Sequence, residues 1–397
     1  MKIQSLRGMR DIHSIEASKL TYIESKILKH TKQYQNIKMP ILEPTELFAR
    51  SIGLETDIVS KEMYTFLDRK NNSITLRPEG TASCVRMALQ NGLIQRQEQK
   101  FCYYGPMFRY ERPQKGRYRQ FMQLGIEFFN YETIDAEIEM LLWANNFLKE
   151  LNINFSLEIN CLGSLDDRQK YSKALVTYFS QEDLDDDSKK RLSTNPMRIL
   201  DSKNPGMQDI INKAPLMKDF VSSDSKSKFE ALLQALEKLD IAYKINPKLV
   251  RGLDYYNDSV FEWVASDGLG SQNAIGGGGR YDGLVEILGG KATPAVGCAF
   301  GIDRILNLIS IPDDKCENVI LSDNLRRLEA FEFSKTFAPG TFSIYIGNGK
   351  IDKQFKFADS VNANKVFHFS DELKEGTVKF KLKDDTSWQV RYTKLNQ

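Results

Sequence analysis

The chain has 397 residues, with 55 lysines and arginines against 53 aspartates and glutamates, giving a formal net charge of +2. This length allows two or three domains with substantial cores. The near-neutral charge excludes a generally basic surface, so any affinity for RNA must come from local basic patches. The chain start lacks the apolar region of a signal peptide, and no run approaches the roughly 20 apolar residues of a membrane span.

Cysteine and histidine usage narrows the possible chemistry. The five cysteines are widely spaced and form no C-x-x-C pair, which disfavours a disulfide framework and a thiolate zinc site. Three histidines are too few and too scattered to favour a His-based triad or a metal cage. We therefore expect a cytoplasmic protein without a set of metal-ligating side chains, whose chemistry uses arginine, glutamate, tyrosine and a metal bound with the substrate.

The N-terminal region is predicted to be helical and then extended. Ser14 can cap a helix whose apolar residues recur at helical spacing. Pro40 follows this helix and precedes an extended segment, and by itself it indicates only a helix stop. The apolar positions are Leu20, Ile23, Ile27 and Leu28.

The segment ITLRPEGTASCVRMALQ, residues 74–90, runs from a β-branched strand through Pro78 and Gly80 into a helix. Thr81 or Ser83 is available to cap that helix, and capping would be a sufficient structural explanation for Thr81.

Residues 101–130 are predicted to form two strands joined by a charged loop. In the second strand Met122, Leu124, Ile126 and Phe128 alternate with Phe121, Gln123, Gly125 and Glu127, which is typical of a half-buried strand. Antiparallel pairing is expected to bring Arg109 near Gln123. Such a face offers a guanidinium for a phosphate and a carboxylate and amide for a polar ligand, although a solvated hairpin with ion pairs would alternate in the same way.

Further along the chain, a helix is predicted at 131–150 and a strand after it, followed by a polar, helical stretch from about 164 to 240. By itself this stretch indicates a solvated helical insertion. The segment LVRGLDYYNDSVFEWV, residues 249–264, returns to strand texture.

Two glycine-bearing segments follow. AIGGGGRYDGLVEILGG fits neither G-x-G-x-x-G nor G-x-x-x-x-G-K-[ST], so a dinucleotide-binding or P-loop site is not supported. TPAVGCAFGIDRILNLI predicts a buried strand leading into a helix with Arg304 in its first turn, where the helix dipole disfavours a cation and an anionic ligand is therefore expected. Residues 310–317 are expected to form a linker, and the remainder alternates strands and helices as a small α/β domain.

Several of these segments resemble the class II aminoacyl-tRNA synthetases. GPMFRYERPQKGRYRQFMQLGIEFF resembles motif 2 in the version of the histidyl-tRNA synthetase family, the segment around Pro40 is similar to motif 1, and the segment around Arg304 to motif 3. The R-G-L-D-Y-Y run at 251–256 resembles the histidine-specific signature of that family. The resemblance covers residues 1 to about 310, and KQFKFAD extends it more weakly to the tail.

The resemblance implies an α+β catalytic domain at 1–310, with an antiparallel sheet of six or more strands flanked by helices. It also implies a helical insertion at about 164–240, a small α/β anticodon-binding-like domain at 318–397, and a homodimer formed through motif 1. The implied activity is the ATP-dependent and Mg²⁺-dependent joining of L-histidine to tRNA-His through histidyl-adenylate. The alternative is a catalytically silent regulatory subunit of ATP phosphoribosyltransferase, a paralogue that typically loses the signature arginine and the C-terminal domain.

Site residues follow from the matched motifs. For ATP, the resemblance implies that Arg109 and Arg251 are catalytic and hold the α-phosphate. It also implies that Glu111, Arg117 and Arg304 lie around the nucleotide and that Phe121 stacks on adenine. For histidine, it implies Glu79, Thr81 and Gln123 at the amino group and Glu127, Tyr255, Tyr256 and Tyr281 around the imidazole. Gln114 and Arg119 in the motif 2 loop are the candidates for the tRNA acceptor end. Asp303 departs from the family, which usually has glutamate there.

Overall fold

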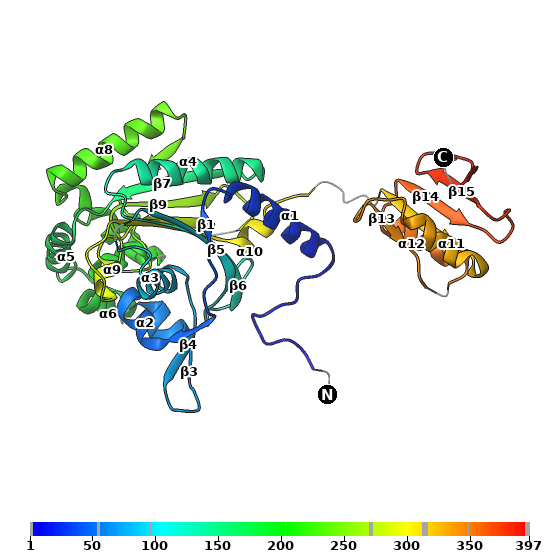
Figure 1. Cartoon of the computed structure of the whole chain (residues 1–397). Helices are drawn as coiled ribbons and strands as arrows, with labels where there is room; N and C mark the ends of the chain where they lie inside the picture. Colours follow the sequence, from blue (N-terminus) through cyan, green and yellow to red (C-terminus); the bar gives the residue numbers. More distant parts are fainter. Residues whose placement is uncertain are drawn as a thin grey trace. The chain divides into compact units, whose positions relative to one another are not determined.

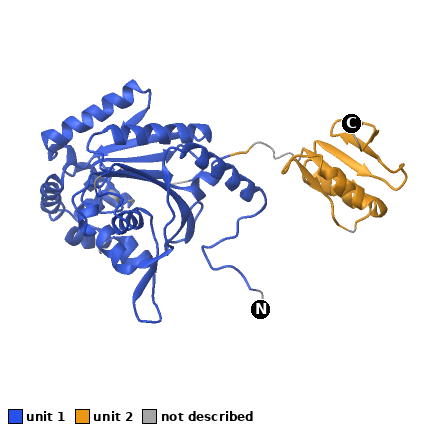
Figure 2. Ribbon diagram, in the orientation of Figure 1, with its two compact units in different colours: residues 1–309 blue, residues 310–397 orange. Residues whose placement is uncertain are grey.

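The computed structural model describes residues 3–53, 56–95, 97–202, 204–269, 273–311, 317–347 and 349–393. The chain divides into two compact units, residues 1–309 and 310–397, coloured separately in Figure 2. Most of the expected linker at 310–317, including Cys316, lies outside the described residues. The other four cysteines are buried free thiols.

The first unit is built on an eight-stranded sheet with the order β1-β5-β6-β11-β10-β9-β7-β8 (Figure 1). The six central strands pair antiparallel, and each edge strand pairs parallel to its neighbour. The expected antiparallel sheet is therefore confirmed, with a short parallel strand added at each edge. The strands are β1 (Gln35–Asn36), β5 (Gln99–Phe108), β6 (Gln120–Phe129), β7 (Phe155–Cys161), β8 (Tyr243–Ile245), β9 (Asn257–Ala265), β10 (Ala274–Arg280) and β11 (Ala295–Gly301).

Helices cover both faces of this sheet (Figure 1). On one side α1 (Ser14–His30) and α4 (Asp135–Glu150) pack together, and the Trp143 indole donates to the His30 carbonyl at 2.7 Å. On the other side α2 (Thr45–Ile52), α3 (Thr81–Gln90) and α9 (Leu284–Ile287) pack against one another. The expectation of a half-buried β6 is wrong, because both of its faces are buried from Gln123 to Phe129.

The expected cap at Ser14 is also wrong. The α1 helix begins at Ser14 itself, the preceding residue is His13, and neither residue makes a side-chain cap hydrogen bond. A small three-stranded sheet, ordered β2-β4-β3, accompanies α2. Its strands are β2 (Leu42–Pro44), β3 (Tyr64–Leu67) and β4 (Ser73–Leu76), and η1 (Ile58–Glu62) and α10 (Ile302–Leu306) complete this unit outside the insertion.

The polar stretch after β7 is helical. Three of its helices begin at side-chain caps, Ser164, Asp185 and Ser222, and Ser164 forms a capping box with Asp167. The helices and short 3-10 turns are α5 (Leu165–Phe179), α6 (Asp186–Thr194), η2 (Pro196–Asp201), η3 (Pro205–Met207), α7 (Gln208–Lys213), η4 (Met217–Asp219) and α8 (Ser223–Lys238). Buried apolar side chains of these elements join the core cluster that also contains Phe101 and Tyr281, so the insertion is packed onto the sheet domain.

The second unit has its own five-stranded sheet, ordered β13-β12-β14-β15-β16, and its own apolar cluster. The first three strands are parallel and the last two join antiparallel. Its elements are β12 (Asn318–Ser322), η5 (Asn324–Arg326), α11 (Arg327–Ser334), β13 (Phe342–Ile344), α12 (Ile351–Ser360), β14 (Lys365–Phe369), β15 (Thr377–Leu382) and β16 (Gln389–Tyr392). Within the described residues, no helix is both long and apolar enough to cross a bilayer.

Candidate active site

A cleft of about 780 Å³ lies in the first unit and draws its walls from the hairpin, the turn into α3, the helical insertion, strands β9 to β11 and the loop before β9. Glu127 and Tyr281 are buried beyond the lining residue Thr81, whereas Gln114 and Arg119 lie outside the lining. The expected site residues that line the cleft are Glu79, Thr81, Arg109, Glu111, Arg117, Phe121, Gln123, Arg251, Tyr255, Tyr256 and Arg304.

Glu127 is fully buried at one end of this cleft and accepts three hydroxyl hydrogen bonds. Thr81 donates at 2.7 Å, Tyr281 at 2.5 Å and Tyr103 at 3.2 Å. Burial raises the pKa of Glu127 to about 8, although the hydroxyl donors oppose that rise. A side chain at Gly297 would collide with this carboxylate, because an added Cβ would lie 1.7 Å from its Oε2.

Tyr103 is a site residue that sequence reasoning missed. It lies directly across the hairpin from Gly125, where an added Cβ would be 2.0 Å from the tyrosine ring. Gly125, which interrupts the alternation of larger side chains in β6, was the available signal for this contact. A glycine within a strand often marks a close approach by another group.

Glu79 caps α3, so the expectation that Thr81 or Ser83 does so is wrong. Its two carboxylate oxygens accept from the backbone N–H groups of Thr81 at 2.6 Å and Ala82 at 2.9 Å. A carboxylate at this position is favoured by the unpaired N–H groups and the positive end of the helix dipole. Burial raises the pKa of Glu79, and these hydrogen bonds counteract part of that rise. The Thr81 hydroxyl is thereby free to bind Glu127.

Arg251 lies between the two ends of the cleft. It forms a hydrogen-bonded ion pair with Glu262, and its guanidinium is 5.9 Å from the Tyr256 ring centroid. A Cβ at Gly277 would lie 2.6 Å from this guanidinium, so the glycine leaves the space that Arg251 occupies. Near it, the Tyr255 hydroxyl and the Gln123 Oε1 atom are buried without a hydrogen-bond partner among the described residues. Such atoms are suited to a polar ligand.

The other end of the cleft collects arginines. Arg109 donates to the Pro78 carbonyl at 2.8 Å and lies 5.4 Å from the Phe121 ring. Arg117 and Arg304 line the same end of the cleft. Burial and the neighbouring Arg117 lower the pKa of Arg304 to about 10. Glu111 offsets part of this charge, since its carboxylate is 3.1 Å from Arg117 and 3.9 Å from Arg109. The arrangement suits a multiply charged anion.

Arg109 is not the hairpin partner of Gln123. Gln123 pairs with Gly105, and the Arg109 N–H instead donates to the Arg119 carbonyl at 3.0 Å. The turn between Gln114 and Arg117 sets this register. The two side chains nevertheless line the same cleft.

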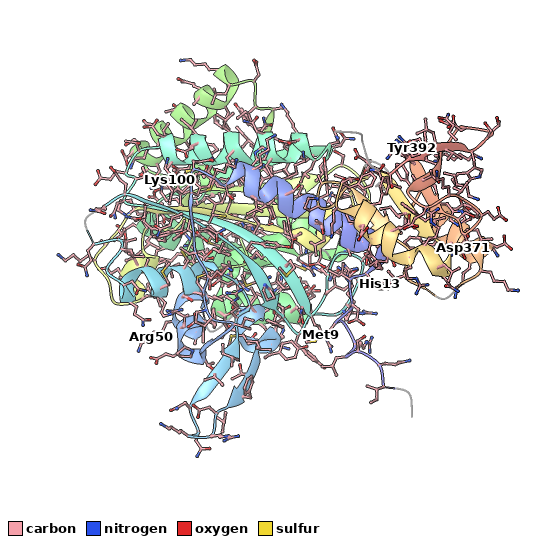
Figure 3. The ribbon with its side chains drawn as sticks, turned by 45° about the vertical axis from the view of Figure 1, so that its right-hand side comes forward. Met9, His13, Arg50, Lys100, Asp371 and Tyr392 are labelled. Atoms are coloured by element: carbon pink, nitrogen blue, oxygen red, sulfur yellow. The ribbon has the colours of Figure 1, made fainter. Side chains whose placement is uncertain are left out.

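The N-terminal segment crosses the base of the hairpin loop. Gly8 accepts from the Arg119 N–H at 2.7 Å, and the Arg119 guanidinium lies 3.6 Å from the Tyr110 ring. Met9 and His13, labelled in Figure 3, mark the course of this segment towards α1. Gln114 is exposed at the turn of the loop.

Asp303 is buried, and its two oxygens are engaged. They accept from the Met122 N–H at 2.8 Å and from Arg10 at 3.0 Å. Arg10 also binds Glu16 at 2.6 Å and lies 4.2 Å from the Tyr118 ring. Through these contacts, Asp303 joins the N-terminal segment to β6. In the part of the chain that the structure describes, no three His, Cys, Asp or Glu side chains are grouped as metal ligands.

Known proteins resemble this chain along most of its length. The family model described as Histidyl-tRNA synthetase matches residues 8–305. A histidine–tRNA ligase of Hydrogenovibrio crunogenus is 46% identical over 91% of this chain and 88% of its own length, and one of Francisella philomiragia is 45% identical over 99% and 97%. The crystal structure of apo S. aureus histidyl-tRNA synthetase has a TM-score of 0.80 and 30% identity, covering 98% of this chain and 97% of that chain. The chain therefore belongs to the histidyl-tRNA synthetase family.

Proposed function

We propose that this protein is a histidine–tRNA ligase, which activates L-histidine with ATP and transfers it to the 3′ end of tRNA-His. The observation that carries the proposal is one continuous cleft with two unlike ends. Its closed end presents a buried carboxylate ringed by hydroxyl groups, and its other end presents three guanidinium groups. An amino acid with a polar ring and a nucleoside triphosphate are complementary to these two ends.

At the closed end, we assign Glu127, Tyr255, Tyr256 and Tyr281 to the imidazole. A carboxylate and phenols can satisfy both ring nitrogens, and a ligand without such nitrogens would leave the buried Tyr255 hydroxyl, which has no partner among the described residues, unpaired. Glu79, Thr81 and Gln123 take the amino group, because an ammonium has three donors and needs acceptors around it. The unpartnered Gln123 Oε1 atom supports this role.

In the first step the histidine carboxylate attacks the α-phosphate of ATP, forming a carboxyl–phosphate bond and expelling pyrophosphate. Arg109 and Arg251 hold the α-phosphate, where negative charge gathers in the transition state. Arg117 and Arg304 hold the outer phosphates with Glu111 beside them, and Phe121 stacks on adenine. In the second step the terminal ribose hydroxyl of tRNA attacks the carbonyl of the adenylate and expels AMP.

Magnesium fits this site as a partner of the nucleotide. The described residues offer single carboxylates along the cleft, such as Glu111 and Glu262, and no grouped ligand set. This suits Mg²⁺, which keeps several waters and binds mainly through substrate phosphates. When bound, it would neutralise charge on the phosphate oxygens.

Further roles complete the proposal. Gln114 at the exposed loop turn and Arg119 at the loop base are assigned to the tRNA acceptor end, and the second unit to the anticodon.

Homodimer formation through the region of Pro40 is supported by the exposed apolar side chains of Ile41, Leu42, Phe66 and Leu67. Buried free thiols fit a reducing, cytoplasmic location.

The alternative is a catalytically silent regulatory subunit of ATP phosphoribosyltransferase that binds histidine without activating it. Such paralogues typically lack the signature arginine and the C-terminal domain. Here Arg251 is placed in the cleft, and the second unit is an independent compact body. Both observations favour the ligase.

The test is ATP–pyrophosphate exchange with each of the twenty amino acids, on the unmodified protein and on Arg251→Ala. We expect exchange with histidine alone, reduced roughly 10²- to 10³-fold in the variant, as when one preorganised charge-stabilising group is removed. No exchange with any amino acid, together with protection from heat by histidine, would instead support the regulatory subunit.

A further inference from the structure

The helical insertion holds the backbone of the loop that carries the histidine signature. Arg168 of α5 donates to the Asp254 carbonyl at 3.0 Å and to the Tyr256 carbonyl at 2.6 Å. Arg198 of η2 donates to the Gly252 carbonyl at 2.9 Å. These bonds reach three carbonyls within one short stretch, which lies between the positions of Arg251 and Tyr256.

A second set of contacts binds the same loop through its only carboxylate. The Asp254 side chain accepts from Asn195 at 2.9 Å and from Arg198 at 3.4 Å. On the other side, an added Cβ at Gly53 would lie 2.5 Å from the Asp254 carboxylate. The carboxylate, whose side chain is 32% exposed, therefore lies between the insertion and the end of α2.

The loop depends on these partners because it is irregular. Residues 249–256 belong to neither a helix nor a strand, so their carbonyl groups have no regular ladder to satisfy them. Burial lowers the pKa of Arg168, and the charge of the nearby Asp254 acts in the opposite direction. A partly buried guanidinium that is used on two carbonyls of one loop fixes the shape of that loop.

We propose that Arg168 and Arg198 are positioning residues for histidine activation. They line no part of the cleft themselves, but they hold the loop that aims Arg251 and Tyr256 into it. The insertion is then required for adenylate formation, before any tRNA is present, and is more than a tRNA-binding appendage. This inference rests on the proposed ligase function.

ATP–pyrophosphate exchange without tRNA tests the inference. In Arg198→Ala and in the conservative Arg168→Lys, kcat/KM for histidine should fall about 10- to 100-fold, the range expected when reacting groups are misplaced by about 1 Å. The KM for ATP should change less than kcat/KM for histidine, because Arg109, Arg117 and Arg304 keep their positions at the phosphate end. Lys190→Ala, an exposed cation of the same insertion, is the matched control and should exchange normally.

A double-mutant cycle separates positioning from a general structural role. In the Arg251→Ala background, Arg198→Ala should cost less than it does in the unmodified protein, because the part of its effect that acts through Arg251 is already lost and only the part that acts through Tyr256 remains. Thermal denaturation of each variant identifies unfolded protein, and Arg168→Lys keeps the test available where Arg168→Ala does not fold.

Two results would overturn the inference while leaving the ligase function intact. One is normal exchange in both variants with only tRNA charging reduced, which would confine the insertion to tRNA binding. The other is additive losses in the double-mutant cycle. Exchange by the unmodified protein tests the proposed function separately.

Discussion

The two ends of the cleft solve the problem of buried polar groups in opposite ways. At the closed end, the carboxylate of Glu127 has a hydroxyl donor on each oxygen, and Glu79 has two backbone donors. At the other end, Arg304 lies with Arg109 and Arg117 as like charges, and its pKa is lowered. The closed end is satisfied within the protein, whereas the arginine end keeps an excess of positive charge beside Glu111, which a bound anion would balance.

This difference predicts opposite relations between stability and function. Substitution at the closed end breaks bonds that the free protein already makes, so it should cost both activity and stability. Removing a cation from the arginine end relieves repulsion in the free protein, so it should cost activity alone.

The largest effect is expected for Glu127→Gln. The amide keeps the shape of the side chain but replaces one acceptor oxygen with a donor that faces the hydroxyl groups. We expect kcat/KM for histidine in pyrophosphate exchange to fall by roughly 10³-fold, the upper range for one preorganised polar group, and the melting temperature to fall as well. The control is Glu139→Gln, which removes a more exposed carboxylate paired with Lys100. Equal losses in the two variants would contradict the prediction.

A smaller loss of activity is expected for Arg304→Gln. It should reduce kcat/KM for ATP by roughly 10²-fold, because one cation that faces the phosphates is lost. The melting temperature without ATP should stay the same or rise, since one like charge leaves a cluster of arginines. Differential scanning fluorimetry with and without ATP checks both points. A clearly lower melting temperature without ATP would show that the cluster is not under repulsion.

A loss of about tenfold is expected for Arg10→Gln, which removes a guanidinium that joins Asp303 to Tyr118. The change should appear in the KM for ATP rather than for histidine, because Tyr118 belongs to the loop at the arginine end. Steady-state exchange at varied ATP and varied histidine separates the two. A matching rise in both KM values would argue against a local role.

The last effect is on stability rather than on activity, and it depends on pH. The pKa of Glu127 is raised to about 8 in the folded protein, against 4.5 for an ordinary glutamate, so the folded state holds this proton more tightly than the unfolded state. Its contribution to stability is complete below about pH 4.5 and is lost as the pH rises through about 8. Urea denaturation between pH 5 and 9 should show the stability of the unmodified protein falling relative to Glu127→Gln. Parallel curves would mean that Glu127 does not titrate in this range.

Much of the molecule could be predicted from local pattern. The alternation of side chains in β6 placed Gln123 and Glu127 on one face of the strand. The proline, the glycine and the helix pattern that follows them located the turn at Glu79, and a similar helix pattern located the helix start near Arg304. The antiparallel sheet and the small α/β unit followed from the same signals together with the resemblance. These features depend on residues close together in the chain, so the sequence by itself determined them.

Contacts between distant segments were decided only by the tertiary structure. Arg10 meets Asp303 across 293 positions, Tyr103 approaches Glu127 because Gly125 leaves space, and Arg168 reaches a loop 86 positions away. The hairpin register depended on the geometry of its turn. The capping of α3 depended on the tertiary position of Glu79, which places its carboxylate within hydrogen-bonding distance of the free N–H groups. Such choices are made by packing and by the requirement that buried polar groups find partners, which no local pattern encodes.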